Sequence, residues 1–198
     1  MSDATTGRRW QAEQRRAQLI DSALDVFAAK GVEGATVKDL SEAAGVAQGL
    51  LYHYFRSKED LLHAALERHY FLPQLSRITS PDRDRPAGDV LLEVVEGFAV
   101  MLREHHQVVQ VMLREAPANP AVVERLERGR QEGVRLLGEY LDSRVLAGEL
   151  RPHDSEAVAR LLLYSAFMAH LTDTPTDRFL PVVVETVLHG IVVRDGNS

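Results

Sequence analysis

Apolar residues recur at three- and four-residue steps along nearly the whole chain, which is the spacing of one face of an α-helix. The first such run comprises Ala17, Ile20, Leu24 and Phe27. No alternation of apolar and polar residues continues long enough to predict a strand, and the valine triplet 182–184 lies in a helical frame. We therefore expect an all-α fold of about nine helices.

Glycine, proline and helix-capping residues divide this pattern into separate helices. The polar segment 1–10 is expected to be a disordered tail, and the first helix is expected to end near Lys30 and Gly31. The charged segment 80–86, with a proline near each end, is predicted to be a loop between a small N-terminal domain and the rest of the chain. Further helices are predicted over residues 36–44, 48–55, 57 to about 70, 87–105, 107–116, 119–147, 154–172 and 176–193.

The composition excludes several classes of protein. The chain has no cysteine, which rules out disulfides, thiolate zinc sites and cysteine nucleophiles. It shows neither the apolar core of a signal peptide nor an uncharged apolar stretch of about 18 residues, so we expect a cytoplasmic protein without a membrane span. Phosphate-loop, nucleophile-elbow and metalloprotease motifs are absent, and we expect no enzymatic activity, cofactor or metal.

Net charge gives no support to nucleic-acid binding. The whole chain carries −6, and residues 1–70, with nine Lys/Arg against ten Asp/Glu, carry −1. Only the first twenty residues are basic, because they hold four arginines and two carboxylates. Any argument for nucleic acid must therefore rest on the local placement of side chains.

Residues 36–62 carry the strongest functional signal. Thr36 can cap a helix, and Asp39 three residues later makes an aspartate variant of the capping box. Ser57 and Asp60 repeat the pattern, and Gly45 lies between them where a tight turn is needed. Two short helices joined by a turn that contains glycine have the shape of a DNA-reading helix-turn-helix.

The side chains of this segment fit that shape. Residues able to cluster between the two helices are Leu40, Ala43, Ala44, Val46, Leu51 and Phe55. The exposed side of the second helix keeps Gln48, Gly49, Leu50, Tyr52, His53 and Tyr54. Amide, phenol and imidazole groups can hydrogen-bond to phosphates and base edges without net charge. A surface of this kind could instead pack against another subunit.

Residues 15–66 resemble the TetR family, chiefly in the 40–46 core and in the aromatic run 51–55 followed by 57–62. The resemblance implies a three-helix helix-turn-helix domain over residues 1–60 and a larger helical domain for effector binding and dimerisation over residues 61–198. It implies phosphate contacts by Thr36, Lys38, His53, Tyr54 and Lys58. It implies major-groove contacts by Gln48, Gly49, Leu50 and Tyr52.

Two further features of the N-terminal part concern the cap of the second short helix and the arginines before the first helix. Ala47 stands where family members commonly have serine or threonine, and the missing cap costs about 0.5–2 kcal/mol. Arg8 and Arg9 could form an arm that reaches a minor groove. A disordered, solvated tail is an equally good reading of the same residues.

The last two predicted helices are apolar on more than one side. Residues 161–169 carry no charge, and Val182, Val187 and Ile191 continue the character in the final helix. A helix that is apolar all round must be buried all round, so one face would meet a partner chain. Two such helices from each of two chains would make the four-helix interface of a homodimer.

The effector site can only be predicted from chemistry, because aromatic and methionine side chains adapt to varied apolar ligands. The candidates are Phe98, Met101, His105, Met112, Leu137, Tyr140, Tyr164, Phe167 and Met168. Each of them could equally be an ordinary core residue. His105 and the adjacent His106 point to different sides of a helix and make a poor metal pair.

These observations, with the resemblance, predict a ligand-responsive transcriptional regulator. It would bind a palindromic operator in double-stranded DNA as a homodimer, and a small apolar or amphipathic effector would release it. Repression is the commoner mode in the family. The alternative is a helical ligand-binding or scaffold protein whose DNA-binding head has lost its function.

Overall fold

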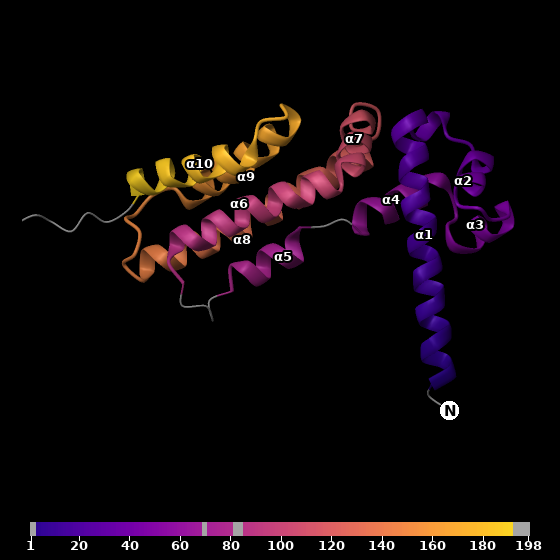
Figure 1. The fold of residues 1–198 in the computed structure, drawn as a ribbon, viewed down its shortest axis with the longest axis horizontal. Coiled ribbons are helices and arrows are strands. Elements are labelled where there is room, and N and C mark those ends of the chain that lie inside the picture. Colours follow the sequence, from indigo (N-terminus) through magenta and orange to yellow (C-terminus); the bar gives the residue numbers. More distant parts are fainter. Residues whose placement is uncertain (1–2, 69–70, 81–84, 192–198) are drawn as a thin grey trace, which may run out of the picture. The chain divides into compact units, whose positions relative to one another are not determined.

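The structure is a computed structural model that describes residues 3–68, 71–80 and 85–191 (Figure 1). This part of the chain is helical and contains no strand, which confirms the all-α prediction. The helices are α1 (Asp3–Gly34), α2 (Val37–Ala43), α3 (Gln48–Tyr54), α4 (Lys58–Arg68), α5 (Leu72–Ile78), α6 (Ala87–Glu104), α7 (His106–Glu115), α8 (Pro120–Leu146), α9 (Ser155–Leu171) and α10 (Thr176–Ile191).

Most helix bounds lie within one or two residues of their predicted positions, and two differences have a physical cause. The helix α5 was not expected, because Pro73 was read as a stop. In the structure this proline lies in the first turn of α5, where a residue without an N–H is tolerated. The helix α1 begins at Asp3, where a disordered tail was expected, because residues 8–18 are mostly strong helix formers.

The helices form two compact units. Unit 1 comprises Met1–Tyr70 and His105–Glu124, and unit 2 comprises Phe71–Glu104 and Arg125–Ser198. The helix α7 thus packs with the N-terminal helices although α6 precedes it in the chain. The functional boundary predicted between residues 60 and 61 remains a prediction. No helix in the described part of the chain is long and apolar enough to cross a membrane.

Unit 1 is built around one apolar face of α1. The side chains of this face, Leu19, Ile20, Ala23 and Phe27, are at most 1% exposed. They recur at helical spacing, and α1 packs against α2, α4 and α7. The buried residues that α4 and α7 contribute to the core of unit 1 include Leu61, Leu62, Ala65, Leu66, Val108 and Val111.

Polar contacts fix α7 against the C-terminal end of α1. The α1 helix breaks at Gly31, whose φ of 72° is accessible to glycine without strain. Just beyond the break, the backbone N–H of Val32 donates to the buried carboxylate of Glu115 at 3.0 Å. Arg114 donates to the carbonyl of Ala28 at 3.2 Å. These contacts satisfy backbone groups that the break in α1 would leave without helical partners.

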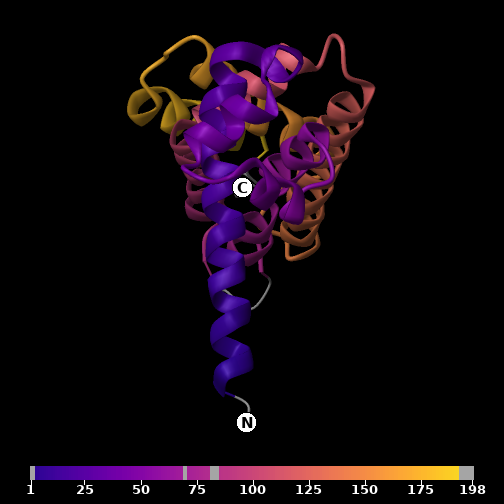
Figure 2. The same ribbon diagram turned by 90° about the vertical axis from the view of Figure 1, so that its right-hand side faces the viewer.

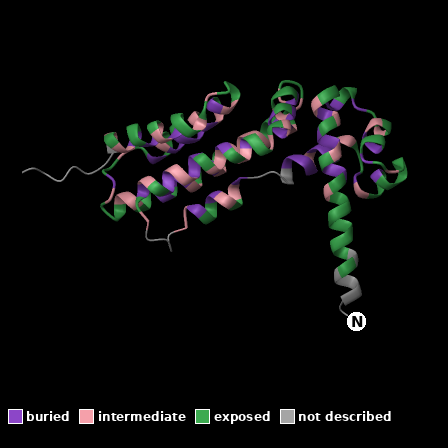
Figure 3. Cartoon of the chain, viewed as in Figure 1, coloured by how far each residue is buried: buried purple, intermediate pink, exposed green. Residues whose placement is uncertain are grey.

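Unit 2 surrounds α6, which packs against α5, α9 and α10. Figure 3 shows buried and intermediate residues recurring along α6, which agrees with its place at the centre of this unit. The start of α9 is capped by Asp154, which accepts the backbone N–H of Ala157 at 2.9 Å. The buried core of unit 2 includes Leu75, Val90, Leu91, Val94, Leu137, Leu141, Leu162, Ala166 and Leu180.

Replacing Glu115 by alanine is expected to destabilise the protein by about 1–3 kcal/mol, because the N–H of buried Val32 would lose its acceptor. Glu115→Gln is the matched control, since a glutamine oxygen can accept the same bond. The free energy of unfolding would be measured by urea titration followed by circular dichroism. An alanine variant as stable as the wild type would contradict this role.

Candidate nucleic-acid interface

The helices α2 and α3 form the predicted helix-turn-helix within unit 1. The turn between them passes through Gly45, whose φ is 64°. The N–H of Gly45 donates to the carbonyl of Glu42 at 3.1 Å, and the N–H of Val46 donates to that of Ser41 at 2.9 Å. These bonds satisfy carbonyls at the end of α2, and the positive φ lets the chain turn at once into α3.

The start of α2 is held by the predicted capping box. The Thr36 hydroxyl accepts the N–H of Asp39 at 3.1 Å, and the Asp39 carboxylate accepts the N–H of Thr36 at 3.0 Å. Lys30 of α1 donates to the same carboxylate at 2.7 Å. The hydrogen bonds from Lys30 and Thr36 lower the pKa of Asp39 to about 2, so this carboxylate stays charged at neutral pH.

The start of α4 has side-chain caps that differ from a capping box in one hydrogen bond. The Ser57 hydroxyl accepts the N–H of Asp60 at 3.1 Å, as the pattern predicts. The Asp60 carboxylate, however, accepts the N–H of Arg56, one residue earlier than in a capping box, at 3.0 Å. The ammonium of Lys58 donates to the carbonyls of Glu33 at 3.1 Å and Ala35 at 3.5 Å. Since an ammonium has three donors, one remains for a phosphate.

The predicted reading face of α3 lies on the surface of unit 1. Tyr52 is 55% exposed and Leu50 is 36% exposed, whereas Leu51 and Phe55 are buried in the core. The ring of His53 meets the ring of Tyr54 edge to face, with centroids 5.3 Å apart. Gln48, Gly49 and His53 are also exposed, and Tyr54 is half-buried. The exposed part of α3 therefore offers amide, phenol and imidazole groups as hydrogen-bond donors and acceptors.

The remaining predicted DNA contacts lie near the starts of α2 and α4. Thr36 and Lys38 are exposed and Lys58 is half-buried, so unit 1 contains all nine predicted residues. A helix start presents backbone N–H groups and a partial positive charge, which suits a phosphate. The roles given to these nine side chains remain predictions.

One residue near this surface was not singled out as a DNA contact. The guanidinium of Arg16, on α1, lies 5.2 Å from the ring centroid of Phe55, the residue that follows α3. The signal was present in the sequence, since Arg16 lies three and four residues before the core residues Leu19 and Ile20. The apolar run of the first helix was read from Ala17 onward, so this register was not followed further toward the N-terminus.

The predicted effector contacts divide between the two units. His105 and Met112 belong to unit 1, and the other seven belong to unit 2. Leu137 and Tyr140 lie in the core of unit 2, with Phe98 and Met101 packed against it. Phe167 is half-buried, while Tyr164 and Met168 are 40% and 52% exposed.

Two features of unit 2 bear on ligand binding. The hydroxyl of Tyr140 is buried and has no hydrogen-bond partner among the described residues, and burial raises the pKa of its phenol. A shallow hollow of about 420 Å³ lies between α5 and α6. None of the nine predicted effector contacts lines it. Its lining consists of Gln74, Arg85, Asp89, Leu92, Glu93, Glu96, Gly97 and Val100.

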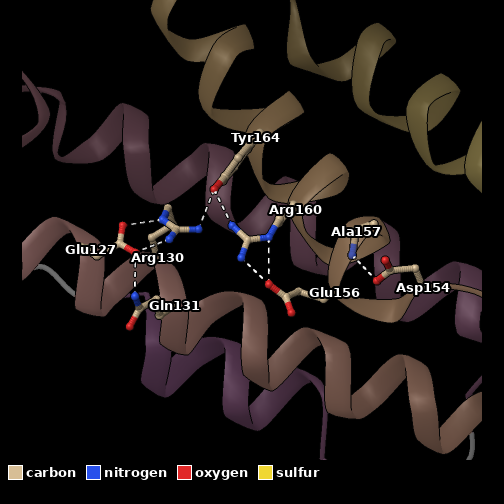
Figure 4. Close-up of polar contacts among 8 residues, drawn as sticks. All are labelled: Glu127, Arg130, Gln131, Asp154, Glu156, Ala157, Arg160 and Tyr164. Carbon is tan, nitrogen blue, oxygen red and sulfur yellow. Dashed lines mark hydrogen bonds and ion pairs between the residues drawn. The ribbon is translucent and has the colours of Figure 1, made fainter.

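One face of α9 is exposed in the single chain, and this helix was expected to present one face to a partner chain. Tyr164 lies on this face, and its hydroxyl accepts from Arg130 at 2.9 Å and Arg160 at 3.3 Å (Figure 4). Glu127 and Glu156 pair with the same two arginines. The large apolar side chains exposed on α9 and α10 include Leu161, Met168, Leu171, Phe179 and Val182.

Two family models match the chain. The model described as "Bacterial regulatory proteins, tetR family" covers residues 19–65. The model described as "AefR-like transcriptional repressor, C-terminal domain" covers residues 89–173. The first match falls on α1 to α4, and the second begins in α6 and ends just after α9.

Curated relatives and solved structures agree with these matches. The repressor KstR2 of Rhodococcus jostii is 40% identical over 65 residues, which is 33% of this chain and 30% of KstR2. The regulator PksA of Bacillus subtilis is 25% identical over 92% of each chain. The SmeT–triclosan complex aligns with a TM-score of 0.77 over 92% of this chain and 93% of SmeT, at 23% identity. The alignment with KstR2 thus spans less than one third of that relative, and the SmeT likeness concerns the fold.

Replacing Ala47 by serine is expected to stabilise the protein by about 0.5–2 kcal/mol, because Ala47 has extended backbone angles and caps α3 without a side-chain hydrogen bond. Ala43→Ser is the matched control and should give no gain, since Ala43, which was wrongly expected to pack between α2 and α3, is exposed in the structure. The comparison would use the free energy of unfolding from urea titration. If the Ala47→Ser variant is no more stable than the wild type, another interaction already compensates for the missing side-chain hydrogen bond at the start of α3.

Proposed function

The chain belongs to the TetR family of bacterial regulatory proteins, and we propose that it is a cytoplasmic, ligand-responsive repressor that binds a palindromic operator as a homodimer. The family is one of transcriptional regulators. The observation that carries the proposal is the exposed, uncharged face of α3, held between two capped helix starts.

The chemistry of α3 fits sequence reading in a major groove. Gln48 and His53 can donate and accept hydrogen bonds at base edges or phosphates, and Tyr52 can do so at the end of a rigid ring. The buried side chains of Leu51 and Phe55 fix the helix from behind. Lys38 and the starts of α2 and α4 supply the phosphate contacts that set the register on the duplex.

The proposed dimer uses the exposed apolar face of α9 and α10. Leu161 and Met168 of α9 and Val182 of α10 are each more than half exposed in the single chain, and exposed large apolar side chains of this kind are typical of an interface. Two such faces related by a twofold axis would bury each other. A homodimer bound to a palindromic operator would place its two recognition helices about 34–36 Å apart, the repeat of the major groove.

The proposed effector is a small apolar or amphipathic molecule bound within unit 2. The buried hydroxyl of Tyr140 supports this, because a ligand oxygen or nitrogen would satisfy a polar atom that no described side chain satisfies. Phe98 and Met101 lie against the same core and could adapt to the apolar part of a ligand. The effector would release DNA only by the difference in its affinity for the free and DNA-bound states.

The test is to recover genomic DNA fragments with the purified full-length protein and to titrate one fragment in a mobility-shift assay. Tyr52→Ala is expected to weaken binding by about 1–3 kcal/mol, because a contact to a base edge is lost. Lys38→Ala should make the slope of log K against log salt shallower by about 1.8, because the dimer loses one phosphate contact in each protomer at about 0.9 each. Gln110→Ala, at an exposed position of α7, is the control.

Two outcomes would contradict the proposal. Unchanged affinity in Tyr52→Ala would remove this side chain from the site. Failure of the wild type to recover any DNA fragment would favour the alternative of a scaffold protein.

Met168→Glu is expected to raise the dissociation constant of the dimer by about a hundredfold or more, since each dimer would bury two unpaired carboxylates. Sedimentation equilibrium over a range of concentrations measures this. Arg77→Glu, at an exposed position of α5, is the control for the added negative charge. A Met168→Glu dimer as tight as the wild type would place the interface elsewhere.

A further inference from the structure

The N-terminal segment of α1, residues 3–17, projects beyond the packed part of unit 1 (Figures 1 and 2). The first side chain of α1 that is buried, among those the structure describes, is Leu19. Trp10 is 63% exposed, and Arg9, Arg15 and Arg16 are exposed as well. About four turns of helix without tertiary packing are marginal in water, so a binding partner would stabilise this segment.

The arginines of this segment lie mainly on one side of the helix. Arg16 is three and four residues before Leu19 and Ile20, which places it on the core-facing side of α1. Arg9 is seven residues before Arg16, about two turns, and so points the same way. Arg15 borders them on one flank, and Glu13 is the one carboxylate near them, so this side of the helix stays positive.

This arginine face begins beside the proposed reading helix. The guanidinium of Arg16 lies over the ring of Phe55, and the ring of Phe55 lies 6.5 Å from that of Tyr54 at the end of α3. The face then continues along α1, away from the core of unit 1, through Arg9. It therefore extends the surface of α3 with cationic groups that α3 itself lacks.

We propose that residues 3–17 form a second DNA-contacting element, whose arginine face binds backbone phosphates next to the half-site read by α3. The inference rests on the proposed function. A guanidinium matches a phosphate with two parallel hydrogen bonds, and such contacts need no particular sequence. They would supply the electrostatic attraction that a neutral reading face and a chain of net charge −6 do not.

The helical conformation of residues 3–17 decides between contact in the minor groove and contact along the phosphate backbone. An α-helix with its side chains is about 10–12 Å wide, and the minor groove is about 6 Å wide. The arm in the minor groove considered for Arg8 and Arg9 therefore does not fit this structure, and contact along the phosphate backbone does. Nor does the segment fit a membrane surface, because Trp10 is its one large apolar side chain and no apolar face accompanies it.

The experiment uses the full-length protein and a duplex recovered by genomic selection, with roughly one helical turn of flanking DNA on each side. Binding is followed by fluorescence anisotropy at several potassium chloride concentrations. In the variant Arg9→Gln/Arg16→Gln, the slope of log K against log salt should be shallower by about 3.6, because the dimer loses two phosphate contacts in each protomer at about 0.9 each. Arg9→Gln alone, which leaves the contact with Phe55 intact, should account for about half of this change.

The matched control moves the charges instead of removing them. Adding Gln11→Arg and Gln14→Arg to the double variant restores the net charge on the opposite side of the same helix. We expect it not to restore the slope, and full restoration would overturn the assignment to this face. Equal slopes in the wild type and the double variant would overturn the inference. The proposed function would still stand in that case if Tyr52→Ala weakened DNA binding.

Two further outcomes have distinct meanings. If the wild type recovers no DNA fragment, the proposed function fails and this inference fails with it. If the double variant loses binding to phosphatidylglycerol vesicles but keeps the wild-type salt dependence on DNA, the arginine face serves an anionic membrane, and the inference is overturned.

Discussion

Burial of one face of α1 is the interaction on which unit 1 depends. Phe27 is fully buried, and the same face carries Leu19, Ile20 and Ala23 at helical spacing. These side chains meet α2, α4 and α7, so α1 organises the helices that hold the helix-turn-helix. The reading helix α3 is only seven residues long and could not persist alone, because a helix of that length gains too few hydrogen bonds to offset nucleation.

The local signals for unit 1 could be read from the sequence because they are short-range. The capping box of Thr36 and Asp39 and the positive φ at Gly45 both follow from residues a few positions apart. The nine predicted DNA contacts gather in unit 1 for the same reason, since α2, α3 and the start of α4 are consecutive. Their roles at the duplex concern a partner, and periodicity cannot establish them.

Long-range features were harder to predict. Pro73 was read as a stop, but a proline can begin a helix as well as end one, and only packing decides between the two. The pairing of α7 with α1 joins residues more than eighty positions apart, through Val32 and Glu115, and no local pattern encodes it. For α9, composition predicted one face packed within the chain and another against a partner chain, and the single chain does leave one face exposed, but composition did not identify which residues form it.

The connection between the units constrains how an effector could act. The chain passes from one unit to the other at residues 70–71, 104–105 and 124–125, and the last crossing lies inside the continuous helix α8. The segment between the second and third crossings contains α7, which Glu115 and Arg114 fasten to the end of α1. Within unit 1, these bonds join α7 to α1, which supports the helix-turn-helix and also bears the arginine face.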